Sequence, residues 1–433
     1  MNWQKVYQEK LISKEEAVKH IQSGNRVVVS HAVGEPSVLL DAMVANKEQY
    51  KDVEVVHMVP RGKAEYAQEG MEPYFRHNAF FVGGTTKDAI NSGRGDFTPC
   101  FFHEIPRLFI NGSMPVDVAL VQLSTPDEHG YCSFGVAVDY SKPAAEAAKL
   151  VIAEINDQMP RTLGDSFIHI SDIDYAVEVS HPVLELQPAK ITDVEKSIGR
   201  YCASLIEDGS TLQLGIGSIP DAVLLFLKDK KDLGIHSEMI SDGVVELVEA
   251  GVITNKKKSI NSGKSTVTFL MGTKQLYDYV DNNPAVELRP VDYVNDPLVV
   301  MQNYKMIAIN SCVQVDLMGQ VASESIGLNQ ISGVGGQVDF VRGAAMAEDG
   351  KSIMAITSTT AKGKISKIVP FLDHGAAVTT SRQDVDYVVT EYGIASLRGK
   401  TLRQRARNLI NIAHPNFKEE LVEEFEKRFN EKF

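Results

Sequence analysis

The chain has 433 residues, of which 43% are hydrophobic, 23% charged and 7% aromatic. This is the composition of an ordinary globular protein, and it excludes a largely disordered, collagen-like or coiled-coil chain. With 44 Lys and Arg against 57 Asp and Glu, the formal net charge is -13. Nucleic acid is therefore not expected as a partner, because phosphate-backbone binding needs a basic face.

Features of membrane, secreted and metal-binding proteins are also missing from the sequence. No run of 18 apolar residues is present, so no membrane span is expected. Charged residues stand in the first ten positions, where a signal peptide would have an apolar core. The four cysteines form no Cys-x-x-Cys pair, and no His/Asp/Glu cluster has zinc-like spacing. We expect a cytoplasmic protein with reduced cysteines and no metal.

In the first half, short β-branched runs alternate with amphipathic stretches. Residues 26–30 (RVVVS) predict a strand, and residues 36–43 predict a helix with Pro36 in its first turn. Further strands are predicted at residues 53–58, 79–82, 116–122 and 150–154. This rhythm predicts a mainly parallel, doubly wound sheet covered by helices.

The second half repeats the pattern of the first. A turn, an apolar strand, a small-residue loop and a proline before a helix occur at residues 24–36 (GNRVVVSHAVGEP) and 209–220 (GSTLQLGIGSIP). Residues 116–135 likewise resemble residues 306–327. We predict two related, open, mainly parallel α/β domains, an internal pseudo-repeat, at residues 1–185 and 186–433. Chance similarity between α/β segments is the alternative. Residues 416–433 predict a solvated terminal helix.

Two glycine-rich segments are candidates for ligand binding. Residues 215–220 (GIGSIP) follow a predicted strand and precede a helix, so unpaired backbone N–H groups and the helix N-terminus favour a phosphate, carboxylate or oxyanion. Pro220 stands where a dinucleotide fingerprint has its third glycine. Residues 333–336 (GVGG) form the second cluster. Taken alone, either segment is equally well a tight structural turn.

Glu238 lies in a short, mostly apolar run (IHSEMI, residues 235–240) that resembles a single strand, where an unpaired carboxylate is costly to bury. Asp242 and Gly243 follow and open a predicted helix over residues 244–250. Glu238 is therefore a candidate catalytic residue, the alternative being a polar residue satisfied at a sheet edge. His31 follows the first strand, and by the internal repeat we assign it the position of Gly215. A structural or exposed histidine is the alternative there.

Six ordered segments together resemble the family I coenzyme A-transferases, in the branch that includes the acetyl-CoA hydrolases/transferases. The resemblance covers nearly the whole chain, and within that branch it is strongest to transferases of 4-hydroxybutyrate and butyrate. It implies an active site between two α/β domains, and a homodimer. The segments are the glycine loop with Gln213 and Pro220, and residues 234–239 (GIHSEM), 295–297 (NDP), 335–340 (GGQVDF), 358–362 (STTAK) and 389–393 (VTEYG).

The resemblance also implies a role for each matching residue. The nucleophilic glutamate falls on Glu238 and the oxyanion-stabilising amide on Asn295, while His31 belongs to the first-domain loop that faces the glutamate. The residues implied to contact CoA are Gln213, Leu214, Gly215, Ile216, Gly217, Gly336 and Lys362.

The implied activity is ping-pong transfer of CoA between a short-chain acyl-CoA and a carboxylate such as acetate, through a glutamyl-CoA thioester. The acyl group would be 4-hydroxybutyryl, butyryl or acetyl. CoA would be a cosubstrate, and no tightly bound cofactor is expected. Two alternatives stay open at this point: hydrolysis of acyl-CoA on the same fold, and a non-catalytic sensor that binds CoA or a nucleotide.

Overall fold

The computed structural model describes residues 3–433, which form two compact units. Unit 1 comprises the described part of Met1–Gln187 together with Thr266–Val294, and unit 2 comprises Pro188–Ser265 and Asn295–Phe433. The domain boundary at residues 185/186 stays a prediction, and each unit is described by itself.

Unit 1 is built on a seven-stranded sheet in which every neighbouring pair is parallel. Its central strands are almost continuously apolar, as expected for a parallel sheet with both faces covered. Val27, Val29, Leu39 and Met43 belong to its buried core. In spatial order the strands are β4 (Gly95–Phe97), β3 (Phe75–Ala79), β2 (Val53–Val56), β1 (Arg26–Val29), β5 (Val118–Leu123), β7 (Leu150–Asn156) and β9 (Tyr175–Val179).

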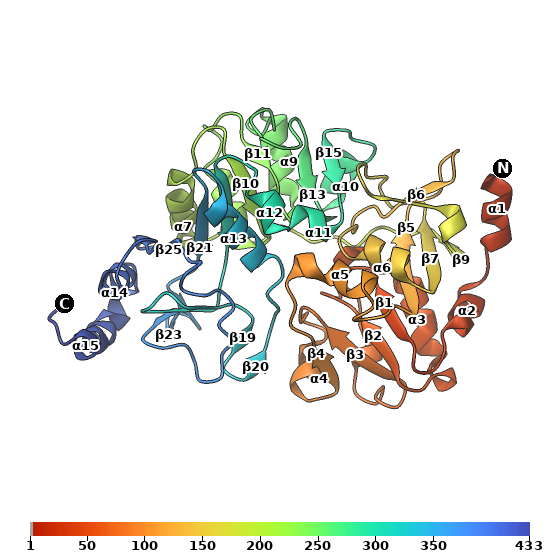
Figure 1. Cartoon of the computed structure of the whole chain (residues 1–433), viewed down its shortest axis with the longest axis horizontal. Helices are drawn as coiled ribbons and strands as arrows, with labels where there is room; N and C mark the ends of the chain where they lie inside the picture. Colours follow the sequence, from red (N-terminus) through yellow and green to blue (C-terminus); the bar gives the residue numbers. More distant parts are fainter. Residues whose placement is uncertain (1–2) are drawn as a thin grey trace. The chain divides into compact units, whose positions relative to one another are not determined.

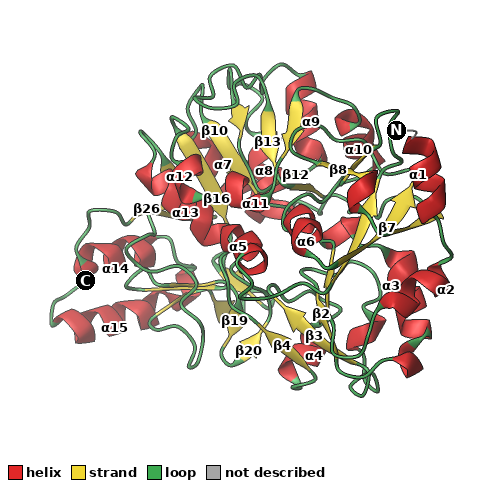
Figure 2. Cartoon of the chain, turned by 45° about the vertical axis from the view of Figure 1, so that its right-hand side comes forward, coloured by secondary structure: helices red, strands yellow, loops and turns green. Residues whose placement is uncertain are grey.

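Helices connect or flank the strands of unit 1, as Figure 2 shows in red and yellow. They are α1 (Trp3–Lys10), α2 (Lys14–Ala17), α3 (Ser37–Ala45), α4 (Lys87–Asn91), α5 (Ile105–Ile110), α6 (Ser141–Ala147), α10 (Lys274–Val280) and α11 (Val291–Val294). Shorter strands pair outside the main sheet: β6 (Tyr131–Ser133) with β8 (Phe167–His169), and β13 (Ser265–Val267) with β15 (Val286–Leu288). Strand β14 spans Phe269–Leu270.

Unit 2 is built on a six-stranded sheet, parallel except for its last strand. In spatial order the strands are β11 (Gly234–Ile235), β10 (Thr211–Leu214), β16 (Met306–Asn310), β21 (Lys351–Ala355), β25 (Tyr387–Thr390) and β26 (Gly393–Ser396). The helices are α7 (Asp193–Ser204), α8 (Ser218–Leu225), α9 (Asp242–Glu249), α12 (Pro297–Val300), α13 (Gln337–Met346), α14 (Leu402–Asn411) and α15 (Lys418–Phe429). Helices α14 and α15 lie side by side near the C-terminus (Figure 1).

Short strands of unit 2 lie outside this sheet. Strand β17 (Gln314–Asp316) pairs with β18 (Val321–Ala322) and β24 (Ile368–Val369), while β19 (Ser325–Ile326) pairs with β20 (Asn329–Gln330). Strands β22 (Thr359–Thr360) and β23 (Ile365–Ser366) form a separate hairpin, and β12 spans Met239–Ile240.

The two sheets share one strand topology, which confirms the predicted fold class. Strand β1 lies between β2 and β5 and is followed outward by β7 and β9. In unit 2, β10 lies between β11 and β16 and is followed outward by β21 and β25. The turns that begin the repeat also match, because Gly24 N donates to Lys51 O and Gly209 N donates to Lys231 O, both at 2.9 Å. The pseudo-repeat is therefore one of topology as well as sequence pattern.

Three local predictions were wrong. The strand expected at residues 79–82 is β3 (Phe75–Ala79). Its His77 and Asn78 are buried and bind polar groups on β2, so β3 lacks the apolar run on which the prediction relied. The run at residues 235–240 forms two short strands separated by a bend at Glu238. Helix α15 is not simply solvated, since Leu421 and Phe425 are buried in the core of unit 2.

The structure also bears on membrane crossing and on the cysteines. Within residues 3–433, no helix combines the length and the apolar character needed to cross a membrane. All four cysteines are free thiols.

Candidate active site

Glu238 lies just beyond the carboxyl end of a parallel strand. Strands β10 and β11 pair only through Thr211 with Gly234 and Leu212 with Ile235. The chain then leaves the sheet and bends at Glu238, whose side chain is half-buried. Open α/β sheets bind their ligands beyond the carboxyl ends of their strands, so Glu238 is placed for chemistry.

Asn295 contacts the Glu238 carboxylate directly. Its side-chain Nδ2 donates to Glu238 Oε2 at 3.0 Å. Asn295 is fully buried, and within the described residues its Oδ1 has no hydrogen-bond partner. The following residue, Asp296, caps α12 by accepting from Leu298 N at 2.8 Å, which fixes the backbone beside the amide. This cap helps to hold the amide against the carboxylate.

Gly336 completes this cluster, because it leaves room for both side chains. A Cβ at this position would overlap Glu238 Oε2 and Asn295 Nδ2. Gly336 is also the N-cap residue of α13. The positive end of that helix favours negative charge nearby. The structure therefore brings together three of the predicted site residues from three separate segments.

The predicted CoA loop lies between β10 and α8. Gln213 and Leu214 are buried in β10, and residues 215–217 lead into the helix. Gly217 has a φ of +114°, which favours glycine, and a Cβ on Gly215 or Gly217 would meet nothing within 4 Å. The backbone here is open to close approach by a ligand. The Gln213 side chain is oriented by Asn310, whose Nδ2 donates to Gln213 Oε1 at 3.1 Å.

His31 lies in unit 1 and is buried beyond the end of β1. Its Nδ1 is 3.1 Å from Asp139 Oδ2, while its Nε2 has no hydrogen-bond partner within the described residues. Asp139 therefore orients the ring by accepting from Nδ1–H. The predicted equivalence with Gly215 is wrong by one residue. Matching Val29 to Leu214, the last residues of β1 and β10, places His31 opposite Ile216.

Lys362 lies on a hairpin outside the main sheet of unit 2. It occupies the turn between β22 and β23, where it is exposed and has a φ of 58°. Its contact with CoA stays a prediction.

Buried ionisable groups gather at the carboxyl end of the unit 1 sheet. Burial raises the pKa of Glu35, while hydrogen bonds from the backbone N–H groups of Gly62 and Arg61 lower it in part. Burial also holds the pKa of His57 well below its usual range. His57 Nδ1 is 2.8 Å from Tyr66 Oη. A neutral imidazole is thus part of the folded unit at neutral pH.

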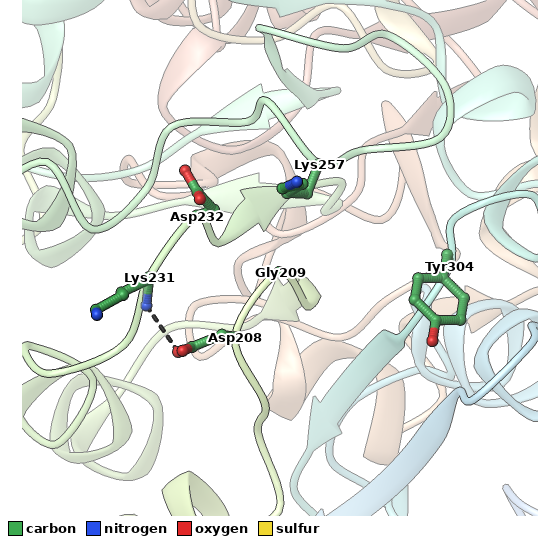
Figure 3. Close-up of a pocket in the computed structure, with 6 residues that line it drawn as sticks. All are labelled: Asp208, Gly209, Lys231, Asp232, Lys257 and Tyr304. Atoms are coloured by element: carbon green, nitrogen blue, oxygen red, sulfur yellow. Dashed lines mark hydrogen bonds between the residues drawn. The ribbon is translucent and has the colours of Figure 1, made fainter.

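A surface pocket at the other end of the unit 2 strands is not the Glu238 site. It lies where β10, β11 and β16 begin, whereas Glu238 follows the end of β11. Figure 3 shows Asp208 accepting from the Lys231 backbone N–H, at 2.8 Å, with Tyr304 across the pocket. Within residues 3–433, no group of three or more His, Cys, Asp or Glu side chains is placed to hold a metal. The pocket is lined by Asp208, Gly209, Lys231, Asp232, Lys257 and Tyr304.

Sequence reasoning missed three residues that support the candidate groups. Asp139 orients His31, Asn310 orients Gln213, and Ser237 binds Leu214. Asn310 was detectable as the polar end of an apolar strand in the repeat. Ser237 and Asp139 carry no comparable signal, since their partners lie 23 and 108 residues away in the chain.

Comparisons with known proteins agree with the fold and cover nearly the whole chain. The acetyl-CoA hydrolase/transferase N-terminal domain matches residues 1–185, and the C-terminal domain of the same description matches residues 272–425. The chain is 70% identical to the 4-hydroxybutyrate coenzyme A transferase of Clostridium kluyveri, over 99% of this chain and 100% of the relative. It is 38% identical to the butyryl-CoA:acetate CoA-transferase of Anaerostipes caccae, over 99% and 98%.

Solved structures give the same picture. The crystal structure of 4-hydroxybutyrate CoA-transferase from Porphyromonas gingivalis is similar with a TM-score of 0.86 and 46% identity, over 99% of this chain and 100% of that one. RipA from Yersinia pestis is similar with a TM-score of 0.94 and 37% identity, over the same shares of the two chains.

Proposed function

The chain belongs to the acetyl-CoA hydrolase/transferase family and is an enzyme, and from this premise we propose that it transfers CoA between a short-chain acyl-CoA and a carboxylate through Glu238. The observation that carries the proposal is the contact of Asn295 Nδ2 with Glu238 Oε2, beside a glycine that leaves the carboxylate room.

In the proposed reaction, a Glu238 carboxylate oxygen attacks the thioester carbonyl carbon. The carbon–sulfur bond breaks, CoA leaves as a thiolate, and a mixed anhydride of the acyl group and Glu238 remains. The thiolate then attacks Glu238 Cδ, the bond from Cδ to the bridging oxygen breaks, and the first carboxylate leaves. A second carboxylate reverses these steps on the glutamyl-CoA thioester. Covalent catalysis of this kind divides one difficult exchange into easier steps.

Asn295 supports the step at Glu238 itself. When the thiolate attacks Cδ, negative charge develops on the carboxyl oxygen that is not bridging. A donor already aimed at that oxygen can stabilise the charge by roughly 3–4 kcal/mol, because no reorganisation is needed during the reaction. The hydrogen bond to Oε2 supports this role for Asn295.

The names of the relatives support 4-hydroxybutyryl-CoA and butyryl-CoA as donors and acetate as acceptor. CoA is then a cosubstrate rather than a bound cofactor. Two further parts of the proposal are a homodimer, which rests on the sequence resemblance, and a cytoplasmic location, which rests on the cysteine pattern and the charged first residues. Light scattering of the purified chain and fractionation of the source cells test them.

Trapping the covalent intermediate tests the proposal. After incubation with butyryl-CoA and then borohydride, activity is expected to fall only in the samples that received acyl-CoA. Peptide mass analysis should place the modification on Glu238. The variant Glu238→Ala should form no adduct and should still bind CoA. The exposed Glu246 of α9 supplies the matched control, and Glu246→Ala should behave as the unmodified chain does. Turnover by Glu238→Ala contradicts the proposal.

The same experiment separates the alternatives. Because the family description includes hydrolases, release of CoA is measured with and without added acetate. A transferase accelerates strongly with acetate, whereas a hydrolase releases CoA at the same rate without it. A non-catalytic sensor binds acyl-CoA and yields neither turnover nor an adduct.

A further inference from the structure

The segment that carries Glu238 stays in contact with the end of β10 beyond the last backbone hydrogen bond between β10 and β11. His236 N donates to Leu212 O at 3.1 Å, which is the last backbone bond from β11 to β10. Backbone groups of alternate residues in a strand point to the same side. The N–H and C=O of Leu214 therefore also point toward β11, where no strand residue remains to pair with them.

Ser237 supplies the missing partner with its side chain. Its Oγ donates to Leu214 O at 3.1 Å and is 3.3 Å from Leu214 N, from which it accepts. Ser237 is 1% exposed, so water does not compete for these bonds. One hydroxyl serves both groups because it is a donor and an acceptor at once. The chain can therefore bend away at Glu238 without leaving the Leu214 backbone unpaired.

We propose that Ser237 is a positioning residue that fixes the glycine loop relative to Glu238. The inference rests on the proposed function. Leu214 directly precedes the glycine loop, and Ser237 directly precedes Glu238. The hydrogen bonds between Ser237 and Leu214 therefore connect the loop to the segment that carries Glu238. A thioester held by the loop reacts with Glu238 only at the correct distance. A misplacement of about 1 Å can cost on the order of 100-fold in rate.

The test compares Ser237→Ala with the unmodified chain in single-turnover formation of the Glu238 adduct from butyryl-CoA. We expect the adduct to form roughly 10- to 100-fold more slowly at saturating butyryl-CoA, while KM for butyryl-CoA changes less than about threefold. Ser237→Thr keeps the hydroxyl and should restore most of the rate.

A matched control separates positioning from general loss of stability. Ser210 is buried at the amino end of β10, where its Oγ accepts from Glu207 N at 3.2 Å. Ser210→Ala removes a hydrogen bond between a side chain and the backbone at the opposite end of β10. It should lower the melting temperature as much as Ser237→Ala does, yet form the adduct at the unmodified rate. An equal loss of rate in both variants overturns the proposal.

The outcomes distinguish this inference from the proposed function. An adduct that forms on Glu238 at the unmodified rate in Ser237→Ala overturns the positioning role and leaves covalent catalysis intact. Absence of an adduct in the unmodified chain overturns the proposed function first. If Ser237→Ala does not fold, Ser237→Cys takes its place, because the thiol is a weaker donor and acceptor of similar size. Its rate should then lie between those of the threonine variant and the unreactive Glu238→Ala, and an unmodified rate overturns the role.

Discussion

Replacing Gly336 with alanine should strongly lower the activity while leaving the fold intact. A Cβ at this position lies more than 1 Å inside the 3.4 Å at which ordinary contact begins, against both Glu238 Oε2 and Asn295 Nδ2. These atoms are the ends of flexible side chains, so they give way rather than the backbone. Gly336 has a φ of -93°, which alanine adopts without strain. Loss of glycine as N-cap costs only about 1 kcal/mol.

The size of the catalytic effect follows from the displacement. The carboxylate and the amide must each retreat by roughly 1 Å, a shift that can lower a rate on the order of 100-fold. Loss of one aligned oxyanion donor costs a further factor of similar size, about 100- to 1,000-fold. These effects overlap because they act on the same bond, so we expect kcat/KM to fall between about 100- and 1,000-fold.

Adduct formation on Glu238 and the melting temperature are measured on the same samples. Gly84→Ala serves as the control, since Gly84 is exposed and a Cβ there meets nothing within 4 Å. The Gly336 variant should melt within a few degrees of the control and form the adduct far more slowly. If the Gly336 variant forms the adduct at the unmodified rate, catalysis does not require the close packing of Glu238 and Asn295 against Gly336. Collapse of the fold would refute the argument that the side chains yield.

Two further predictions concern the loop and unit 1. A Cβ on Gly215 would meet no protein atom within 4 Å, so Gly215→Ala should leave the stability of the fold unchanged. It should raise KM for acyl-CoA roughly tenfold, because the methyl group would occupy space that CoA approaches. An unchanged KM would argue against CoA approaching there. Glu154 raises the pKa of His181 above its ordinary 6.5, so their interaction stabilises the folded chain fully below that pH and is lost as pH rises through the raised pKa. The stability difference between the unmodified chain and His181→Gln, from denaturant unfolding, should therefore shrink as the pH rises above the ordinary pKa of 6.5. A difference that stays constant as the pH rises would contradict the pairing.

Much of the fold could be predicted because its central strands are chemically simple. The valines of β1 and the apolar residues of β5 form short runs that only a covered parallel strand accommodates well. The repeat then predicted the topology of the second sheet, because the Gly24 and Gly209 turns open equivalent strands. The bounds of strand β3 were not predicted correctly because His77 and Asn78 are polar, and the sequence does not show that both find partners on β2.

The site was predictable only in part, for a different physical reason. Residue types and spacing made Glu238 one candidate among several carboxylates, and resemblance to a family added Asn295 and Gly336. Nothing in the spacing shows that these residues meet, because the Asn295 contact spans 57 positions and the Gly336 contact depends on an absent side chain. Ser237 lay beyond reach as well, since its role arises from where β11 stops relative to β10.

Comparison of two carboxylates explains why one is structural and the other suits catalysis. Glu154, at the end of the unit 1 sheet, is fully buried; its Oε2 accepts from Val38 N and Leu39 N at the start of α3, and its Oε1 is 2.9 Å from His181 Nε2. Both oxygens are thus committed to holding helix and sheet together, and any reaction there would cost stability. Glu238 stands at the corresponding end of the unit 2 sheet but is only half-buried, beside a glycine loop with open space. Its Oε2 accepts from the side-chain amide of Asn295. The carboxyl ends of the strands therefore carry a structural carboxylate in unit 1 and a half-buried, oriented carboxylate in unit 2.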